Sequence, residues 1–240
     1  AECLFIHRAH IGNMAEAIRA RGYAVRALTA LAANAGLADS TEYAHWLGVP
    51  ATQDAKETRD VLGEKRPDWL VVDHYALDAA WEKELRSVVG SIAALDDLAD
   101  RPHDCDLLLD QNYFLEAAAR YSEFVPQAAT RLCGPRYALL RPEYARARRL
   151  IGPGRGPVSR VLVFYGGADA DNETGRALRI LSRPEFADLA VDIVIGANNP
   201  HKETLRQQAE QRPLTTFHAP REHLVDLQIE ADLALGAGGT

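Results

Sequence analysis

Three titratable residues follow an apolar run in the first half of the chain. The segment DWLVVDHYALD places Asp73, His74 and Tyr75 directly after Val72. A carboxylate, an imidazole and a phenol at the tip of a strand can transfer a proton or hydrogen-bond a sugar. The alternative is structural, with Asp73 capping the next turn and the other two satisfying local hydrogen bonds. On the residues alone, both interpretations stay open.

Glycine-rich turns follow two apolar runs in the second half. In VFYGGADADNETG, Gly166 and Gly167 come after a strand-like run, and Asp169 and Asn172 precede a helical pattern. The run LALGAGGT ends on a second such turn, with Gly236, Gly238, Gly239 and Thr240. Glycines let backbone N–H groups approach a phosphate, and a helix N-terminus favours an anion. The alternative is a plain turn in which Asp169 and Asn172 only cap the helix. Because the glycine turn recurs, a phosphate or nucleotide site is favoured, although neither a P-loop nor a complete G-x-G-x-x-G is present.

Other polar groups carry weaker signals. The aspartates of the segment 96–110 form no calcium-loop pattern, so a solvated, capped loop is expected there rather than a metal site; they are Asp96, Asp97, Asp100, Asp104, Asp106 and Asp110. The three cysteines are far apart and lack C-x-x-C spacing, which predicts neither zinc nor a disulfide framework. Three arginines of YARARRL are expected on a solvated helix face; they are Arg146, Arg148 and Arg149.

Alternating strands and helices must position these groups. Strands are expected at 3–6, 24–28, 68–75, 91–97, 160–167, 189–197, 215–219 and 232–239. Helices are expected at 13–22, 51–63 and 77–88, and from about 172, 201 and 222. This repeat of strand and helix predicts an α/β fold with two Rossmann-like halves, each a mostly parallel sheet flanked by helices. We expect domains at 1–148 and 158–240, joined by a Gly- and Pro-rich linker at 149–157. Such halves bind ligands at the carboxyl ends of their strands.

Composition narrows the class of protein. The 240 residues include 27 basic and 34 acidic side chains, for a net charge of −7. That balance disfavours nucleic acid or an anionic membrane as the main partner. No apolar run approaches the roughly 20 residues that span a bilayer, and no signal-peptide pattern opens the chain. We therefore expect a soluble cytoplasmic protein.

Six segments in order along the chain carry a resemblance to a known family. They are EYAHWLGVPATQDAKET, PDWLVVDHYALDAAWE, LDDLADRPHDCDLLLDQNY, GPRYALLRPEY, VFYGGADADNETG and LALGAGGT. Together they resemble the nucleotide-sugar hydrolases of pseudaminic acid biosynthesis, which cleave UDP-2,4-diacetamido-2,4,6-trideoxy-β-L-altropyranose. That family is similar in fold to the UDP-N-acetylglucosamine transferase of peptidoglycan synthesis, so the resemblance implies a two-domain GT-B architecture.

The resemblance implies a hydrolysis that needs neither metal nor cofactor, carried out by a monomer. Water attacks the anomeric carbon with inversion, and UDP leaves as an anion stabilised by backbone N–H groups and a helix N-terminus. Carried over by residue, Tyr75 and His74 would face the sugar. The UDP-binding residues would be Gly166, Gly167, Asp169, Asn172, Gly236, Gly238, Gly239 and Thr240.

Two departures from the family pattern limit this expectation. The family begins with a further strand and a G-x-G-H-x-x-R loop whose histidine is the proposed general base, and it continues past GAGGT. HRAHIGN, residues 7–13, lacks that order, so neither His7 nor His10 is assigned as the base. We therefore expect the chain to lack both ends and to be weakly active or inactive by itself. A GT-B glycosyltransferase with a UDP-sugar donor, or an inactive nucleotide-sugar-binding fragment, are the alternatives.

Overall fold

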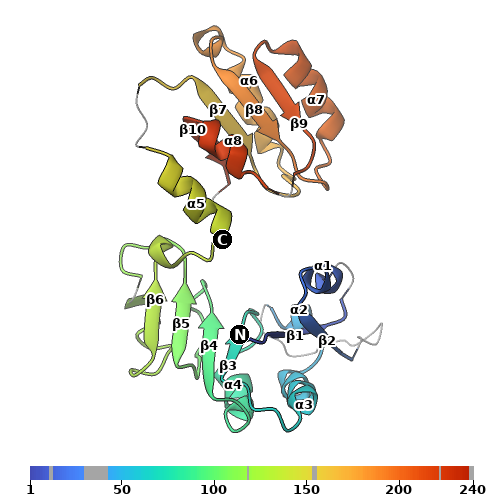
Figure 1. Cartoon of the computed structure of the whole chain (residues 1–240), viewed down its shortest axis with the longest axis vertical. Helices are drawn as coiled ribbons and strands as arrows, with labels where there is room; N and C mark the ends of the chain where they lie inside the picture. The colour runs from blue at the N-terminus through green and yellow to red at the C-terminus, as the bar shows by residue number, and fades with distance from the viewer. Residues whose placement is uncertain (11–12, 30–42, 118, 153–155, 222, 238–240) are drawn as a thin grey trace. The chain divides into compact units, whose positions relative to one another are not determined.

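Parallel strands and connecting helices make up both parts of the chain (Figure 1). The computed structural model describes residues 1–10, 13–29, 43–117, 119–152, 156–221 and 223–237. Contacts divide the chain into two compact units, Ala1–Leu139 and Leu140–Thr240. This division falls ahead of the linker expected at 149–157, because helix α5 (Pro142–Leu150) packs on helix α8 (Val225–Glu230) of the second unit.

The described residues of the first unit form two parallel sheets. β1 (Leu4–Arg8) pairs with β2 (Ala24–Leu28). The other sheet has the order β3-β4-β5-β6, made of β3 (Trp69–Val72), β4 (Ser91–Leu95), β5 (Leu107–Asp110) and β6 (Thr130–Cys133). The α-helices are α1 (Ala15–Ala20), α2 (Ala44–Leu47), α3 (Ala51–Leu62) and α4 (Ala79–Leu85), and 3-10 turns lie at Ala119–Tyr121 and Pro135–Tyr137.

Helix α4 shows how the sequence builds the first core. Asp78 caps it, because its Oδ1 accepts the backbone N–H of Ala80 at 2.9 Å and of Trp81 at 3.3 Å. Trp81 and Leu85 are one turn apart, so they share the buried face of the helix and pack against Ile92 on β4. The apolar stripe of this helix therefore packs into the core beside β4.

In the second unit, the described strands form a parallel sheet of order β10-β7-β8-β9. Its strands are β7 (Arg160–Phe164), β8 (Ala190–Val194), β9 (Thr215–His218) and β10 (Leu233–Gly236). Besides α5 and α8 it contains α6 (Glu173–Leu181), α7 (Lys202–Gln211) and a 3-10 turn at Pro184–Phe186. Side chains alternate along β7, so Val161 and Val163 pack on α6 and α7 while Leu162 packs on the α8 side. Helices thus flank both faces of this sheet.

The predicted α/β class, with parallel sheets flanked by helices, is confirmed. The prediction of a solvated loop over 96–110 is wrong for Leu107–Asp110, which form β5. The apolar run LLLD is buried between β4 and β6, and its acidic neighbours hid this strand in the sequence. Arg146, Arg148 and Arg149 are exposed on α5, as expected.

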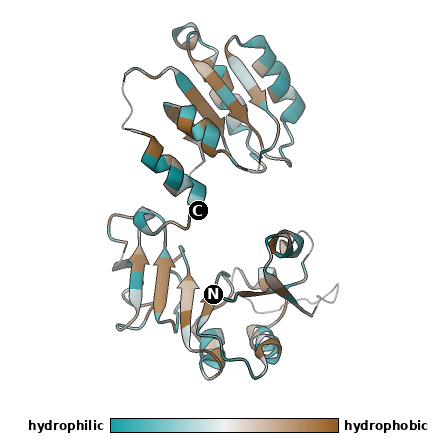
Figure 2. Ribbon diagram, viewed as in Figure 1, coloured by the Kyte–Doolittle hydropathy of each residue, from teal (hydrophilic) through white to brown (hydrophobic). Residues whose placement is uncertain are grey.

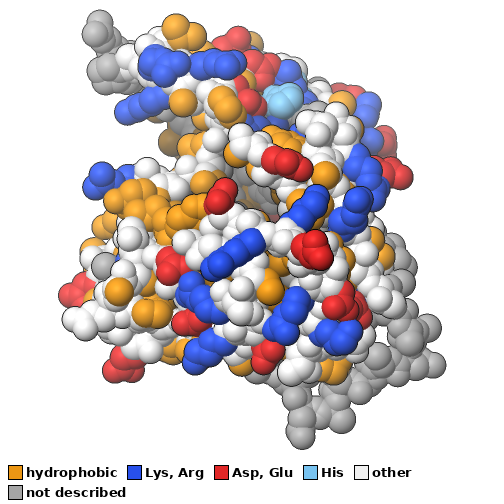
Figure 3. Space-filling view, turned by 60° about the horizontal axis from the view of Figure 1, so that its bottom comes forward, with side chains coloured by type: hydrophobic (Ala, Val, Ile, Leu, Met, Phe, Trp, Pro, Cys, Tyr) orange, Lys and Arg blue, Asp and Glu red, His pale blue; other side chains and the backbone are white. Residues whose placement is uncertain are grey.

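Apolar residues concentrate along the strands, while the outer sides of the helices are polar (Figure 2). Basic and acidic side chains are interspersed over the face that Figure 3 presents. Within the described part of the chain, no helix is both long and apolar enough to cross a membrane.

Candidate functional site

The carboxyl ends of β3, β4 and β5 gather the polar groups of the first unit. His74 and Tyr75 follow β3, Asp96 follows β4, and Asp110 ends β5. The carboxylates of Asp96 and Asp110 are fully buried, which corrects the expectation that they are solvated. Each is paired, as burial of a charge requires: Asp96 lies 2.8 Å from Arg101, and Asp110 lies 2.7 Å from Arg120. Neighbouring strands therefore bring together residues that are distant in sequence.

His74 has a defined proton arrangement. Its Nδ1 accepts the backbone N–H of Ala76 at 3.0 Å. Burial lowers the pKa of His74 from its ordinary value, and electrostatic interactions with His10 and Arg101 lower it further, against the opposing effect of Asp54 and Asp73. A neutral imidazole whose Nδ1 accepts a hydrogen bond carries its proton on Nε2. His74 is therefore suited to donate a hydrogen bond rather than to accept a proton from water.

Tyr75 is likewise a neutral donor. Burial, a hydrogen bond to Asp97 and the negative charges of Asp97, Asp73 and Asp96 together raise the pKa of Tyr75 to about 12, with burial the largest cause. Asp97 also accepts a hydrogen bond from the Asn112 side chain at 3.1 Å. Tyr75 thus keeps its proton across the physiological range.

Buried groups behind this edge hold Asp96 and Arg101 in place. Arg101 donates through Nε to the carbonyl of Leu77 at 3.0 Å. His103 lies between Glu82, at 2.7 Å from Nδ1, and Asp96, at 4.0 Å from Nε2. Glu82 is fully buried and also accepts the backbone N–H of Asp104. The loop after β4 is therefore fastened to helix α4.

A second buried ion pair anchors the end of β1. Arg8 contacts Asp54 at 2.6 Å and Glu57 at 2.8 Å, both on α3. Asp54 also accepts the indole N–H of Trp81 at 3.0 Å. These contacts tie β1 to α3 and α4, close to His10 and His74.

In the second unit, the first glycine turn and Gly236, where the second one begins, lie at the ends of neighbouring strands. Gly166 and Gly167 follow β7, and Gly236 ends β10, where it pairs in register with Phe164. Gly166 has φ of +85°, a conformation that favours glycine. A Cβ on Gly166 or Gly167 would meet no atom within 4 Å, so the described atoms leave space above this turn. Gly238, Gly239 and Thr240 lie outside the described residues.

Asp169 and Asn172 cap helix α6. Asp169 accepts the backbone N–H of Glu173 at 2.8 Å and of Thr174 at 3.1 Å, and Asn172 accepts that of Gly175 at 3.1 Å. The first N–H groups of α6 are thus satisfied by the chain's own side chains. Both capping residues have positive φ, at 46° and 57°. Their observed contacts are structural, and a direct contact with a ligand stays a prediction.

Gly196 is a further residue on which this turn depends. A Cβ at this position would lie 1.9 Å from the carbonyl oxygen of Gly167, because the backbones after β7 and β8 approach closely. We expect Gly196→Ala to lower the free energy of unfolding of the second unit by about 3 kcal/mol. The matched control is Gly167→Ala, which should change it by less than about 1 kcal/mol. Thermal unfolding followed by circular dichroism measures both, and equal stability of the two variants would contradict the close approach.

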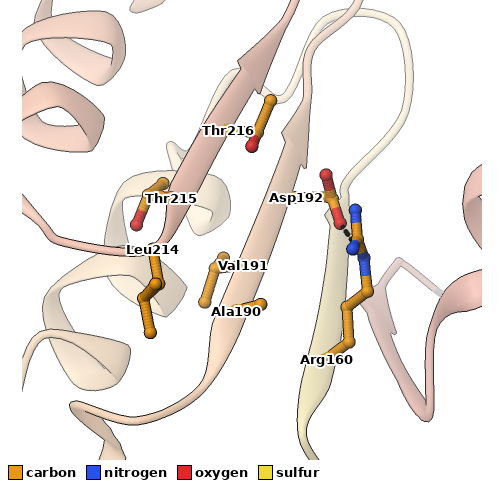
Figure 4. Close-up of a pocket in the computed structure, with 7 residues that line it drawn as sticks. All are labelled: Arg160, Ala190, Val191, Asp192, Leu214, Thr215 and Thr216. Atoms are coloured by element: carbon orange, nitrogen blue, oxygen red, sulfur yellow. Dashed lines mark hydrogen bonds and ion pairs between the residues drawn. The ribbon is translucent and has the colours of Figure 1, made fainter.

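A hollow of about 280 Å³ lies at the other end of this sheet, toward the amino ends of β7, β8 and β9 (Figure 4). Asp192 on β8 lines it and pairs with Arg160 and with His218, each at 2.7 Å. Its carboxylate is thereby satisfied within the unit. Because ligands of parallel sheets bind at the carboxyl ends of the strands, we do not place the candidate site here.

The structure brings together residues that the sequence interpretation did not single out. Arg101 lies 5.8 Å from the centroid of the Tyr75 ring, and Asp97 hydrogen-bonds Tyr75. Both follow β4, so their place after a predicted strand was the available signal. Among the described residues, no group of three or more His, Cys, Asp or Glu side chains could hold a metal ion.

Comparison with known proteins gives two curated relatives. The chain is 25% identical over 183 residues to the UDP-2,4-diacetamido-2,4,6-trideoxy-beta-L-altropyranose hydrolase of Campylobacter jejuni, covering 76% of this chain and 64% of that protein. It is 29% identical over 107 residues to the spore coat polysaccharide biosynthesis protein SpsG of Bacillus subtilis, covering 44% of this chain and 31% of SpsG. The matches thus span less than two thirds of either relative, and they confirm the resemblance predicted from the motifs.

No family model matches the chain. Among solved structures, MurG of Acinetobacter baumannii superposes with a TM-score of 0.49 at 10% identity, over 98% of this chain and 71% of MurG.

Proposed function

We propose that the chain carries the catalytic fold of a hydrolase that acts on a UDP-linked 2,4-diacetamido-2,4,6-trideoxyhexose, in a pathway such as pseudaminic acid biosynthesis. The products are UDP and the free sugar. The observation that carries the proposal is the similarity to the C. jejuni hydrolase over 76% of this chain. The gathering of His74, Tyr75, Asp97 and Arg101 at one sheet edge supports it.

The first unit supplies the sugar side of this reaction. His74 donates from Nε2 to an oxygen atom of the substrate, and the Tyr75 hydroxyl, which has a single proton, donates it to a substrate oxygen in place of Asp97. Water attacks the anomeric carbon, the bond from that carbon to the UDP oxygen breaks, and UDP leaves with the bonding electron pair, while the attacking water gives up one proton to a general base. The fixed donors orient the sugar for that attack.

The second unit supplies the UDP side. Backbone N–H groups of the Gly166–Gly167 turn, beside which the described atoms leave space, and of the turn that begins at Gly236 approach the diphosphate. Asp169 and Asn172 hold the turn by capping α6. Backbone donors that are in place before the reaction stabilise the leaving anion without reorganisation.

Release of UDP without any acceptor tests the proposal. Because the match covers 64% of the C. jejuni relative, two proteins are assayed. One is this chain, and the other is this chain joined to the relative's segments outside the match. We expect the joined protein to release UDP and free sugar in equal amounts, and this chain to release them more slowly.

The C. jejuni hydrolase serves as the positive control. UDP release that requires an added sugar acceptor would favour the glycosyltransferase alternative. Saturable UDP binding with no release by either protein would favour a nucleotide-sugar-binding module.

A further inference from the structure

Three aromatic rings meet beside the candidate site in the first unit. Tyr43, Trp46 and Tyr75 form an aromatic cluster in which each ring contacts the other two. The centroids of Tyr43 and Trp46 are 5.2 Å apart, those of Tyr43 and Tyr75 5.3 Å, and those of Trp46 and Tyr75 5.8 Å. The rings are tilted against one another by 40° to 63°.

Trp46 is the exposed member of this cluster. It lies on the short helix α2, which is anchored by the buried side chains of Leu47 and Val49. The Trp46 side chain itself remains 48% exposed. The helix is thus fixed by other residues, so its folding does not require an indole at position 46. Trp46 thus places an exposed ring beside the polar groups of the candidate site.

Polar groups border the aromatic cluster on the side of Tyr75. The Arg101 guanidinium lies 5.8 Å from the centroid of the Tyr75 ring, and His74 precedes Tyr75 in the same loop. His74 presents an N–H donor from Nε2, as its contact with Ala76 requires. An apolar surface with donors at its border matches a ligand that has both methyl groups and carbonyl oxygens.

We infer that the aromatic cluster binds the sugar of the nucleotide-sugar substrate and that Trp46 determines specificity for its methyl and acetamido groups. This inference rests on the proposed function. A 2,4-diacetamido-2,4,6-trideoxyhexose carries three methyl groups, one at C6 and one in each acetyl group. Their C–H bonds pack on the aromatic rings, and an acetyl carbonyl accepts a hydrogen bond from the border of the cluster. On the same surface, the hydroxyl groups of a fully hydroxylated hexose would lose their hydrogen bonds to water and gain no methyl packing to offset that loss.

Calorimetric titration of the 240-residue chain tests the inference with three probes: UDP, UDP-glucose and the UDP-linked diacetamido sugar. We expect Trp46→Ala to weaken binding of the diacetamido sugar nucleotide about tenfold and to leave UDP binding unchanged. The preference over UDP-glucose should shrink by the same factor. Trp46→Phe keeps an aromatic ring, so it should retain most of the affinity for the diacetamido sugar nucleotide. This result would also show that the fold tolerates replacement of Trp46.

Trp69→Ala is the matched control. Trp69 is 51% exposed in the same unit, but it lies at the opposite end of β3 from Tyr75. Binding by Trp46→Ala that equals the wild type, or equal losses in Trp46→Ala and Trp69→Ala, would overturn the inference and leave the proposed function standing. A wild-type chain that binds none of the three probes would overturn the proposed function, and the inference with it.

Discussion

Replacing Arg8 by methionine should lower the free energy of unfolding of the first unit by about 3–5 kcal/mol. The Arg8 and Asp54 side chains are only 3% and 6% exposed. Methionine keeps most of the buried volume but leaves the Asp54 carboxylate without its cation. The Asp54 carboxylate would keep the hydrogen bond from the indole N–H of Trp81, but one neutral donor does not compensate for the burial of its negative charge.

Urea unfolding followed by tryptophan fluorescence measures this change. All three tryptophans, Trp46, Trp69 and Trp81, lie in the first unit, so the signal reports that unit alone. The control is Lys56→Ala, which removes an exposed ion pair with Asp60 on the same helix and should cost less than about 0.5 kcal/mol. A loss no larger for Arg8→Met than for this control would contradict the role of the buried pair.

Replacing Tyr75 by phenylalanine should lower kcat about 100-fold and change KM little. The variant keeps the ring that contacts Trp46 but removes the hydroxyl, which is held protonated beside Asp97. If that hydroxyl donates to the substrate in the transition state, the loss appears in kcat. Initial rates of UDP release by the joined protein give both constants.

Tyr23→Phe is the control for this experiment. Tyr23 precedes β2, at the edge of its sheet away from the strands' carboxyl ends, and it packs on Phe5. Its loss of a hydroxyl should leave kcat unchanged. A kcat for Tyr75→Phe within a factor of about three of the wild type would show that the Tyr75 hydroxyl takes no part in the reaction. Tyr75 would then contribute only its ring, as a member of the aromatic cluster.

The sequence predicted the elements whose apolar periodicity was undisturbed. β7 and β8 read as apolar runs because both faces of their sheet are covered, and α4 begins at a capping aspartate. β5 was hidden because its four residues are flanked by aspartates, and only pairing with β4 and β6 makes them a strand. Local pattern therefore missed a strand that is specified by its neighbours.

The candidate site was predicted in part. The position of His74 and Tyr75 at a strand tip follows from the order of elements, and the structure gathers charged groups around them. Arg101, Trp46 and Gly196 could not be assigned from spacing, because each acts through a contact with a residue far along the chain. For Asp169 and Asn172, the sequence left two interpretations open, capping of the helix or contact with a phosphate. The structure shows the capping contacts.

In the proposed reaction, water attacks the sugar carbon and leaves the diphosphate intact. Hydrolysis by the joined protein in water enriched in oxygen-18 tests it, with the mass of the released UDP as the readout. UDP is the product to measure, because the anomeric hydroxyl of a free sugar exchanges its oxygen with water. We expect UDP without the heavy isotope. UDP that carries oxygen-18 would show cleavage at phosphorus and contradict attack at the anomeric carbon.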